Sequence, residues 1–267
     1  MEDIFEEIVK IRSEGGRAAL ATITSINGST PRKEGSKMLV RSDGTILGSI
    51  GGGSVEAQVC QEAMKITKEG KSRILRFNLT GKEGAEEGMI CGGNMEIFLE
   101  PILPEPSLYI FGGGHISFSI AKIGKMVGFK VVVIDDRAEF ANPERFPEAD
   151  EIIAQGFASV FPRLKINKSS YIVIVTRGHL QDEKVIEWAV KTDAGYIGMI
   201  GSKKKNQTVF SHLQSKGISK KLLDSVYAPI GLDIYAETPE EIAVSIIAEI
   251  IKVRREKEPA GVKTWEV

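Results

Sequence analysis

Three glycines and a histidine, Gly112-Gly113-Gly114-His115, separate a short apolar run from a segment with helical spacing. In such a strand–turn–helix unit, Gly112 permits the tight turn, Gly114 lets the backbone approach a phosphate, and the free N–H groups of the helix attract an anion. Asp135 follows 23 residues after Gly112, at the end of the next apolar run. A carboxylate there can accept hydrogen bonds from ribose hydroxyls. The spacing therefore predicts a nucleotide site of the Rossmann type.

Two features of this segment leave alternatives open. Ser117 stands where the third glycine of the G-x-G-x-x-G pattern normally permits tight helix–strand packing, so a turn that serves close packing alone is the other interpretation. His115 can face solvent at the start of the helix or point its ring at a ligand. Asp136, beside Asp135, is a further candidate for the binding site.

Two more loops follow apolar runs in the second half of the chain. His179 ends the loop 176–179, and Gly201-Ser202 precedes three consecutive lysines. Because the carboxyl ends of parallel strands meet at the sheet edge where ligands bind, we expect these loops near the glycine turn. Gly201 and Ser202 then form a second anion site at a helix start, with a solvated basic face as the alternative for the lysines. Residues 231–233 are further candidates for this edge.

A second glycine cluster, Gly51-Gly52-Gly53-Ser54, lies in the first half of the chain. The pattern places a strand before it and a helix after it, and Ser54 is predicted to cap that helix. The glycines either let the backbone approach a ligand or form a tight packing corner. Gly52, Gly53 and Ser54 are therefore candidate binding residues.

Cys91 is the side chain best suited to covalent or metal chemistry in the first half. It precedes two glycines in a predicted loop, where a thiol is more approachable than on the apolar face of a helix, the setting of Cys60. Because most free cysteines are small buried apolar residues, packing is the alternative to a chemical role.

The elements that position these residues differ between the two halves of the chain. Residues 1–103 are predicted to form a smaller mixed α/β domain, in which Ser42-Asp43-Gly44 turns a hairpin. The patterns behind this prediction are helical spacing over 3–13 and about 55–67, and strand-like runs at 17–26, 36–50, 72–79 and 94–100.

The second half alternates short continuous apolar runs with helical segments, which is typical of a parallel sheet buried on both faces. We therefore expect a Rossmann-like α/β domain over residues 107–267, separated from the first domain by the prolines at 101, 104 and 106. Its last helix carries a clear start signal, with Thr238 as the cap, Pro239 in the first turn and Glu241 three residues after the cap.

Composition excludes several classes of protein. Lys and Arg number 35 against 36 Asp and Glu, so no basic surface for nucleic acid or anionic membrane is expected. No apolar run reaches the roughly 18 residues of a membrane span. Two cysteines cannot form a disulfide framework and fit a cytoplasmic protein. Three histidines without close Cys/His spacing make a structural zinc site unexpected.

The chain resembles the XdhC/CoxI family, the accessory proteins of bacterial molybdenum hydroxylases such as xanthine dehydrogenase. The match runs over nearly the whole chain, and the joint order of its blocks is more specific than any single block. The blocks are GSTPRKEGSKMLVRSDGTILGSIGGGSVEAQV (28–59), CGGNMEIFLEP (91–101), IFGGGHI (110–116), IDDRAEFANPERFPEAD (134–150), TRGH (176–179), YIGMIGSKKK (196–205) and APIGLDIYAETPEEIAVSIIAEI (228–250).

The resemblance implies a function as well as a fold. It implies a protein that binds the molybdenum cofactor, as molybdopterin or its dinucleotide form, and protects it while a cysteine desulfurase installs the terminal sulfido ligand. The protein then delivers the cofactor to a molybdenum hydroxylase. An accessory role rather than catalysis, and a homodimer, are expected on the same ground.

The family's motifs carry over to this chain residue by residue. The nucleotide-type turn corresponds to Gly112, Gly114, His115 and Asp135. Cys91 matches a cysteine before paired glycines, and is implied as a candidate for sulfur relay or molybdenum contact. In two places the chain departs from the family. Ser54 stands where many relatives have a cysteine, and His179 alone remains where many relatives have two histidines.

Two other functions fit parts of the pattern. An NAD(P)-dependent oxidoreductase would use the same glycine turn and Asp135, although no obvious proton-relay pair or substrate motif accompanies them. A nucleotide-sensing module without chemistry would need the turn but not Cys91.

Overall fold

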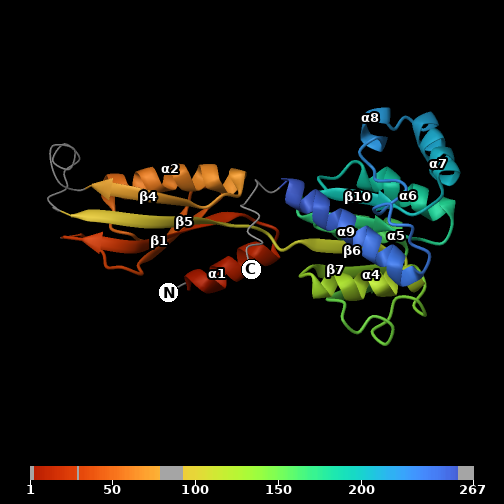
Figure 1. Ribbon diagram of the computed structural model, residues 1–267, viewed down its shortest axis with the longest axis horizontal. Coiled ribbons are helices and arrows are strands. Elements are labelled where there is room, and N and C mark those ends of the chain that lie inside the picture. Colours follow the sequence, from red (N-terminus) through yellow and green to blue (C-terminus); the bar gives the residue numbers. More distant parts are fainter. Residues whose placement is uncertain (1–2, 29, 79–92, 258–267) are drawn as a thin grey trace. The chain divides into compact units, whose positions relative to one another are not determined.

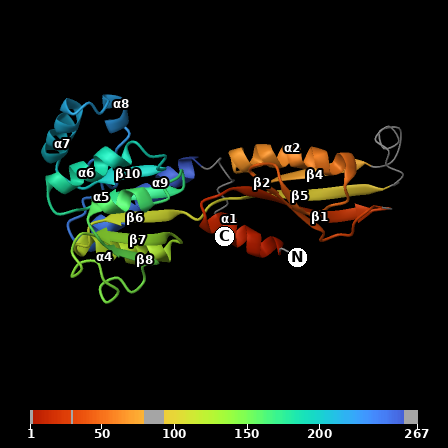
Figure 2. The ribbon, with the colours of Figure 1, turned by 180° about the vertical axis from the view of Figure 1, so that it is seen from behind.

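The computed structural model describes residues 3–28, 30–78 and 93–257. The chain divides into two compact units between Pro104 and Glu105. Figures 1 and 2 show the ribbon from opposite sides. Each unit contains a five-stranded sheet, antiparallel in the first unit and parallel in the second.

The first unit is built on a sheet with the strand order β3-β2-β1-β5-β4. Its long central strand β1 pairs with β2 on one side and with β5 on the other, so Leu20 lies opposite both Leu39 and Glu100. Ser42-Asp43-Gly44 turns the chain between β2 and β3, as predicted. The elements are α1 (Ile4–Ser13), β1 (Ala18–Asn27), β2 (Lys37–Arg41), β3 (Ile46–Gly48), α2 (Gly53–Glu69), β4 (Arg73–Asn78) and β5 (Asn94–Ile102).

Alternation along β1 gives this sheet two buried faces. Ala19, Ala21 and Ile23 pack with α2, while Ala18 and Leu20 pack with α1 on the opposite face. Because successive strand residues point to opposite faces, the consecutive apolar residues 18–21 can all be buried only if both faces of the sheet are covered. The two helices supply that cover.

The second unit is built on a parallel sheet with the strand order β10-β9-β6-β7-β8. If β6 to β10 are numbered 1 to 5 and the sheet is read from β8, the order is 3-2-1-4-5, that of a Rossmann sheet. Its switch point lies between β6 and β9. Tyr227 forms a parallel bridge to Gly198 and continues the sheet beyond β10. The elements are β6 (Ser107–Phe111), α4 (His115–Met126), β7 (Lys130–Asp135), β8 (Glu151–Ala154), α5 (Phe157–Val160), η1 (Phe161–Arg163), β9 (Ser170–Ile174), α6 (His179–Ala189), β10 (Tyr196–Met199), α7 (Lys203–Ser215), α8 (Lys220–Leu223) and α9 (Pro239–Lys257).

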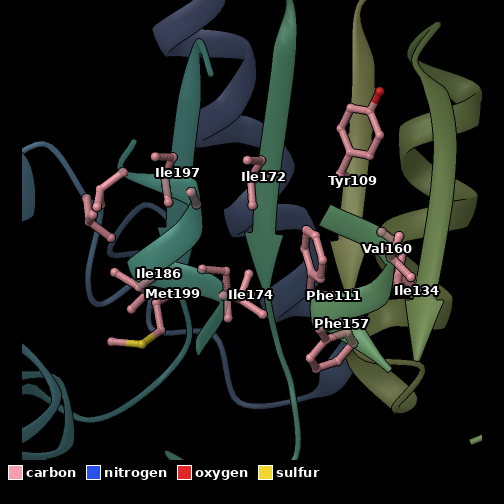
Figure 3. Close-up of a cluster of buried hydrophobic side chains, with 14 of the residues drawn as sticks. Tyr109, Phe111, Ile134, Phe157, Val160, Ile172, Ile174, Ile186, Ile197 and Met199 are labelled. Atoms are coloured by element: carbon pink, nitrogen blue, oxygen red, sulfur yellow. The ribbon is translucent and has the colours of Figure 1, made fainter. Parts of the chain in front are cut away.

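The faces of the parallel sheet are also both covered. Tyr109 and Phe111 on β6 point into the cluster beneath α5 and α6, where the ring of Phe111 lies 5.5 Å from that of Phe157 (Figure 3). Leu108 and Ile110 point to the other face, beneath α4 and α9. These strands are apolar at consecutive positions because neither face meets water.

The predicted fold class is confirmed: an α/β chain with a Rossmann-like parallel sheet after a smaller antiparallel unit. The capping box of α9 is also present, since the Glu241 N–H donates to Thr238 Oγ1 (3.2 Å) and the Thr238 N–H to Glu241 Oε2 (3.0 Å). The sequence patterns did not predict β8, a strand of only four residues at the sheet edge with a single fully buried position.

Candidate functional site

The glycine turn follows β6 at the switch point of the sheet. Gly112 has a φ of 111°, and a Cβ atom there would lie 2.4 Å from the Val175 carbonyl oxygen. A Cβ atom on Gly113 would lie 2.4 Å from the Phe140 carbonyl oxygen. Both glycines are therefore required by the close approach of neighbouring loops, which is the packing role considered from the sequence.

Gly114 differs from its two neighbours. It has a φ of −73°, and a Cβ atom there would meet no described atom within 4 Å. Gly114 is the N-cap of α4, and no side chain of the described residues caps this helix. The first helical hydrogen bond runs from the Phe118 N–H to the Gly114 carbonyl (3.3 Å), so the N–H groups of residues 115–117 precede it. This helix start is open to an anion.

Asp135 ends β7 beside the turn, with both carboxylate oxygens engaged. Oδ2 accepts from the Gly113 N–H (2.8 Å) and Arg137 Nη2 (3.0 Å). Oδ1 accepts from the Arg137 N–H (3.0 Å) and Nε (2.9 Å). A carboxylate has about four acceptor positions, so these four bonds fill it. A ribose hydroxyl would have to displace Arg137.

These contacts also set the charge of Asp135. Its side chain is only 3% exposed. Burial raises its pKa, but the hydrogen bonds from Arg137 and from the Gly113 N–H outweigh burial and hold the pKa below the usual value. The Arg137 guanidinium in turn lies 3.6 Å from the centre of the Phe140 ring. Asp135 therefore braces the turn as a carboxylate.

Two further arginines reach the same place. Arg145 Nε donates to the Gly113 carbonyl (2.9 Å), and Arg177 Nη2 donates to Asp136 Oδ2 (3.1 Å). Asp136 thus links the loop after β7 to the loop after β9. Arg137 and Arg177 are paired with Asp135 and Asp136, whereas Arg145 donates to a neutral carbonyl and can attract a negatively charged ligand.

The loop after β9 brings His179 to the first position of α6, where it is exposed. His115 occupies the same position in α4 and is also exposed. Within α6, the fully buried Asp182 accepts from Thr176 Oγ1 (2.6 Å) and Lys205 Nζ (2.6 Å). This network joins the loops after β9 and β10, and predictions from sequence did not include it.

The predicted second anion site has a different role. Ser202 Oγ accepts from the Lys205 N–H (3.2 Å) and caps α7. A Cβ atom on Gly201 would lie 2.4 Å from Asn206 Oδ1, so this glycine closes around a buried side chain. An open depression of about 480 Å³ nevertheless lies at the starts of α6 and α7, lined by Gly178, His179, Ser202, Lys204, Lys205, Thr208 and Val209.

The four long helices that begin at this edge fall into two pairs. α7 and α9 are capped by their own residues, Ser202 and Thr238. α4 and α6 begin with glycines, Gly114 and Gly178, and neither has a side-chain cap among the described residues. The uncapped helices follow β6 and β9, the two strands on either side of the switch point.

The glycine cluster of the first unit surrounds a carboxylate of its own. Glu56 Oε1 accepts from Ser49 Oγ (2.7 Å), the Ile50 N–H (3.0 Å) and the Gly51 N–H (3.2 Å). Burial raises the pKa of Glu56, but these bonds and one from the Gly52 N–H lower it overall. The predicted cap is wrong: Gly52 is the N-cap of α2, and Ser54 lies in its first turn. Gly51, Gly52 and Gly53 all have a positive φ, and the helix starts among them, before Ser54. The usual preference for Ser at the cap therefore does not decide the start of α2.

Two family models match this chain. The XdhC Rossmann domain matches residues 108–250, and the XdhC and CoxI family matches residues 11–78. The chain belongs to the XdhC and CoxI family. The glycine turn, Asp135, His179 and Ser202 fall within the XdhC Rossmann domain, and the cluster at 51–54 falls within the XdhC and CoxI match.

Relatives of this XdhC-family chain have different names. It is 34% identical over 94% of its length to "Uncharacterized protein YqeB" of Escherichia coli K12, of which it spans 46%. It is 24% identical to a protein of Bacillus subtilis named as a probable xanthine dehydrogenase subunit, with 89% of this chain and 93% of that protein covered. It is also 24% identical to "Molybdenum cofactor insertion chaperone PaoD" of E. coli K12, with 94% and 87% covered.

A solved structure shares the fold of the XdhC family member described here. The crystal structure of a protein described as a xanthine dehydrogenase from Bacillus halodurans superposes with a TM-score of 0.53 at 24% identity, covering 97% of each chain. Among residues 3–28, 30–78 and 93–257, no group of three or more His, Cys, Asp or Glu could hold a metal ion. No helix in these ranges is long and apolar enough to cross a membrane.

The structure brings together only part of the predicted site. Gly112, Gly113 and Asp135 form one hydrogen-bonded turn with Gly114 and His115 at its open end, and Asp136 reaches the loop before His179 through Arg177. Gly52, Gly53 and Ser54 belong to the other unit, and Cys91 lies outside the described residues. Arg137 and Arg145 were missed, although their positions two and ten residues after Asp135 on the same loop were a usable signal.

Proposed function

We propose that this protein is a maturation factor that binds the molybdenum cofactor, holds it during sulfuration and delivers it to a molybdenum hydroxylase such as xanthine dehydrogenase. Membership of the XdhC and CoxI family supports the proposal. So does the likeness, over most of both chains, to a protein named as a molybdenum cofactor insertion chaperone.

The observation that carries the proposal is the pair of uncapped helix starts at the switch point. Gly114 leaves open the space that a Cβ atom would fill, and the N–H groups at the start of α4 can donate to an anion there. Arg145 adds positive charge from a neighbouring loop, while Arg177 is paired with Asp136. This donor set fits the phosphate of a molybdopterin or of its dinucleotide form.

The residues of this chain have distinct tasks in the proposal. Gly114 and the first N–H groups of α4 bind the phosphate through the backbone, and Asp135 holds the Gly113 N–H and Arg137 in place beside it. His115 and His179, exposed at the two helix starts, orient the ligand by hydrogen bonds. When bound, the cofactor supplies the molybdenum chemistry of the client enzyme, and the chain only holds, shields and releases it.

Gly201 and Ser202 support the depression beside α6 in this proposal, through the start of α7 that they shape. Gly52, Gly53 and Ser54 are proposed as cofactor-binding residues of the first unit, with Glu56 fixing their loop. Cys91 is proposed as the sulfur relay or molybdenum contact, since a thiolate is a soft ligand suited to either task. The proposed partners are the hydroxylase, a cysteine desulfurase and a second copy of this chain in a homodimer.

An NAD(P)-dependent oxidoreductase is the competing function. It requires Asp135 to accept from ribose hydroxyls, and all of its acceptor positions are filled by Gly113 and Arg137. NAD(P) therefore remains only the alternative occupant that the test must exclude.

The test is to purify the protein from cells that make the cofactor but lack the client hydroxylase. Bound pterin is oxidised and measured by its fluorescence, and bound NAD(P) is measured enzymatically. We expect pterin near one per chain in the wild type and its loss in Gly114→Val, a variant that fills open space and keeps the fold. NAD(P) at one per chain without pterin would contradict the proposal.

A second variant tests the thiol separately. Cys91→Ser is expected to retain pterin, because the phosphate subsite is intact, but to deliver a cofactor without the sulfido ligand. The measurement is the activity of the apo-hydroxylase after transfer. A Cys91→Ser protein that activates the hydroxylase as well as the wild type does would remove the thiol from the mechanism.

A further inference from the structure

One residue of the second unit has a strained backbone and an exposed aromatic ring. Tyr235 has a φ of 57°, and it alone has a positive φ among the non-glycine residues that the structure describes. Its side chain is 90% exposed. A bulky residue in the left-handed region is unusual and costs free energy. Since the exposed ring gains nothing from burial in return, its strain points to a role in binding.

The packing of α4 against α9 brings the segment before α9, which carries Tyr235, to the edge of the sheet where the glycine turn lies. A Cβ atom on Gly124 of α4 would lie 4.0 Å from Ile247 of α9. Further along both segments, just past the end of α4, the Arg254 guanidinium of α9 lies 4.9 Å from the centre of the Phe129 ring. α4 and α9 therefore run in the same direction, and both begin at the carboxyl edge of the sheet (Figure 1).

The register of this contact fixes the level of the two helix starts. Residues in contact differ in number by 123 for Gly124 and Ile247, and by 125 for Phe129 and Arg254. The N-cap Gly114 and the cap residue Thr238 differ by 124. Because equal steps along two parallel helices cover equal distances, the two starts lie at the same level on neighbouring helices.

The segment that carries Tyr235 also stands beyond the sheet edge. The Ile230 N–H donates to the carbonyl of Met199, the last residue of β10 (3.0 Å), and the Leu232 N–H donates to the Ser245 carbonyl (3.2 Å). Ser245 lies six residues into α9, so the start of α9 projects about 9 Å past this point. Residues 233–238 connect Leu232 to the start of α9 along that projection.

We infer that Tyr235 is a positioning residue that stacks on the planar heteroaromatic ring of the ligand whose phosphate binds at the glycine turn. The inference rests on the proposed function and specifies the ligand as a phosphate joined to a flat ring. That ring is a pterin or a nucleobase, and both present the face that an aromatic side chain recognises. The left-handed backbone at Tyr235 directs the ring into solvent, where it is accessible before the ligand binds.

The experiment compares Tyr235→Gly, Tyr235→Phe and the wild type. Glycine adopts a φ of 57° without strain, so Tyr235→Gly is expected to keep the melting temperature or raise it by about 2–4 °C. Binding of inorganic phosphate, 5′-GMP and 5′-CMP is measured by calorimetry, and bound pterin by fluorescence after oxidation. Inorganic phosphate is the matched control because it has no ring.

We expect Tyr235→Gly to bind inorganic phosphate as the wild type does and to bind the ring-bearing ligands about 5- to 100-fold more weakly. Tyr235→Phe should restore that loss. A loss confined to pterin identifies the pterin as the stacked ring, and a loss confined to the nucleotides identifies the nucleobase. Equal binding by Tyr235→Gly and wild type would overturn the inference while leaving the proposed function standing. A wild type that holds neither pterin nor nucleotide would overturn both.

Discussion

The two glycine clusters of this protein look alike in sequence but differ in what their N–H groups bind. In the first unit, the N–H groups of Ile50 and Gly51 donate to Glu56, a residue of the helix that follows. In the second unit, the carboxylate of Asp135 comes from another strand and, of the N–H groups in the glycine turn, binds that of Gly113. The helix start at Gly114 keeps its donors.

This difference shows what a glycine-rich helix start does and does not indicate. Both helices begin at a glycine without a side-chain cap among the described residues, but in the first unit a carboxylate of the helix itself takes the N–H groups of the loop, whereas the N–H groups at the start of α4 can take an anion from outside. The carboxylate that binds the cluster is Glu56 in the first unit, three positions after the last glycine. In the second unit it is Asp135, 21 positions after the last glycine. The glycines alone therefore do not distinguish the two cases.

The largest effect is expected from a methyl group at Gly112. In Gly112→Ala, the added Cβ lies 2.4 Å from the Val175 carbonyl oxygen at a φ of 111°. Overpacking and backbone strain together should lower the free energy of unfolding by roughly 3–5 kcal/mol. Urea denaturation of the purified variant measures this loss. A change below about 1 kcal/mol would mean that the turn is not held as described.

Asp135→Asn is expected to have the next largest effect. It leaves the Arg137 guanidinium without its buried partner, at a cost of roughly 2–3 kcal/mol. Because the pKa of Asp135 is lowered in the folded state, its stabilisation is complete above the ordinary value of 3.8 and is lost as pH falls below it. The difference in unfolding free energy between wild type and variant should therefore shrink below that pH. A difference independent of pH would show that the charge does not matter.

Glu56→Gln tests the enclosed cluster in the same way. The amide keeps one acceptor oxygen but loses the charge that the N–H groups of Ile50 and Gly51 stabilise, so a loss of about 1–2 kcal/mol is expected. Thermal unfolding monitored by circular dichroism measures it. The amount of pterin bound per folded chain should stay close to that of the wild type, in contrast to Gly114→Val.

The smallest effects compare two glycines with no described atom near their absent Cβ atoms. Gly52 has a φ of 81°, so Gly52→Ala should cost about 1 kcal/mol from backbone strain alone. Gly114 has a φ of −73°, so Gly114→Ala should change stability by less than about 0.5 kcal/mol while weakening phosphate binding. Denaturation measures the change in unfolding free energy of both variants, and phosphate titration measures their affinity for phosphate. Equal phosphate binding in Gly114→Ala and wild type would contradict an anion subsite there.

Much of the fold could be predicted because its signals are local. The apolar run that begins β1, the continuous apolar runs in β6 and β9, and the capping box of α9 each reflect a rule that acts within about ten residues. β8 was missed because a strand of four residues at a sheet edge has too little pattern to recognise.

The site was predicted less well because residue types and their order do not show which side chains become partners. Nothing in the order of residues shows that Arg137 fills the acceptor positions of Asp135, or that Lys205 reaches Asp182 across 23 residues. Ser202 has the residue type of both an anion ligand and a cap, and the fold alone decides that it caps α7. Positions were thus predictable, but the partners of the side chains were not.

The two-sided core of the second unit has a consequence for its synthesis on the ribosome. The central strand β6 is translated first, but Ala243, which helps α9 to cover one face of the sheet, follows Phe111 by 132 residues. At bacterial and eukaryotic synthesis rates this delay is roughly 7 to 26 s. Until α9 is made, α4 is the helix that covers Leu108 and Ile110, so part of this apolar sheet face stays exposed in the nascent chain. A stalled or truncated product would keep that exposed apolar surface.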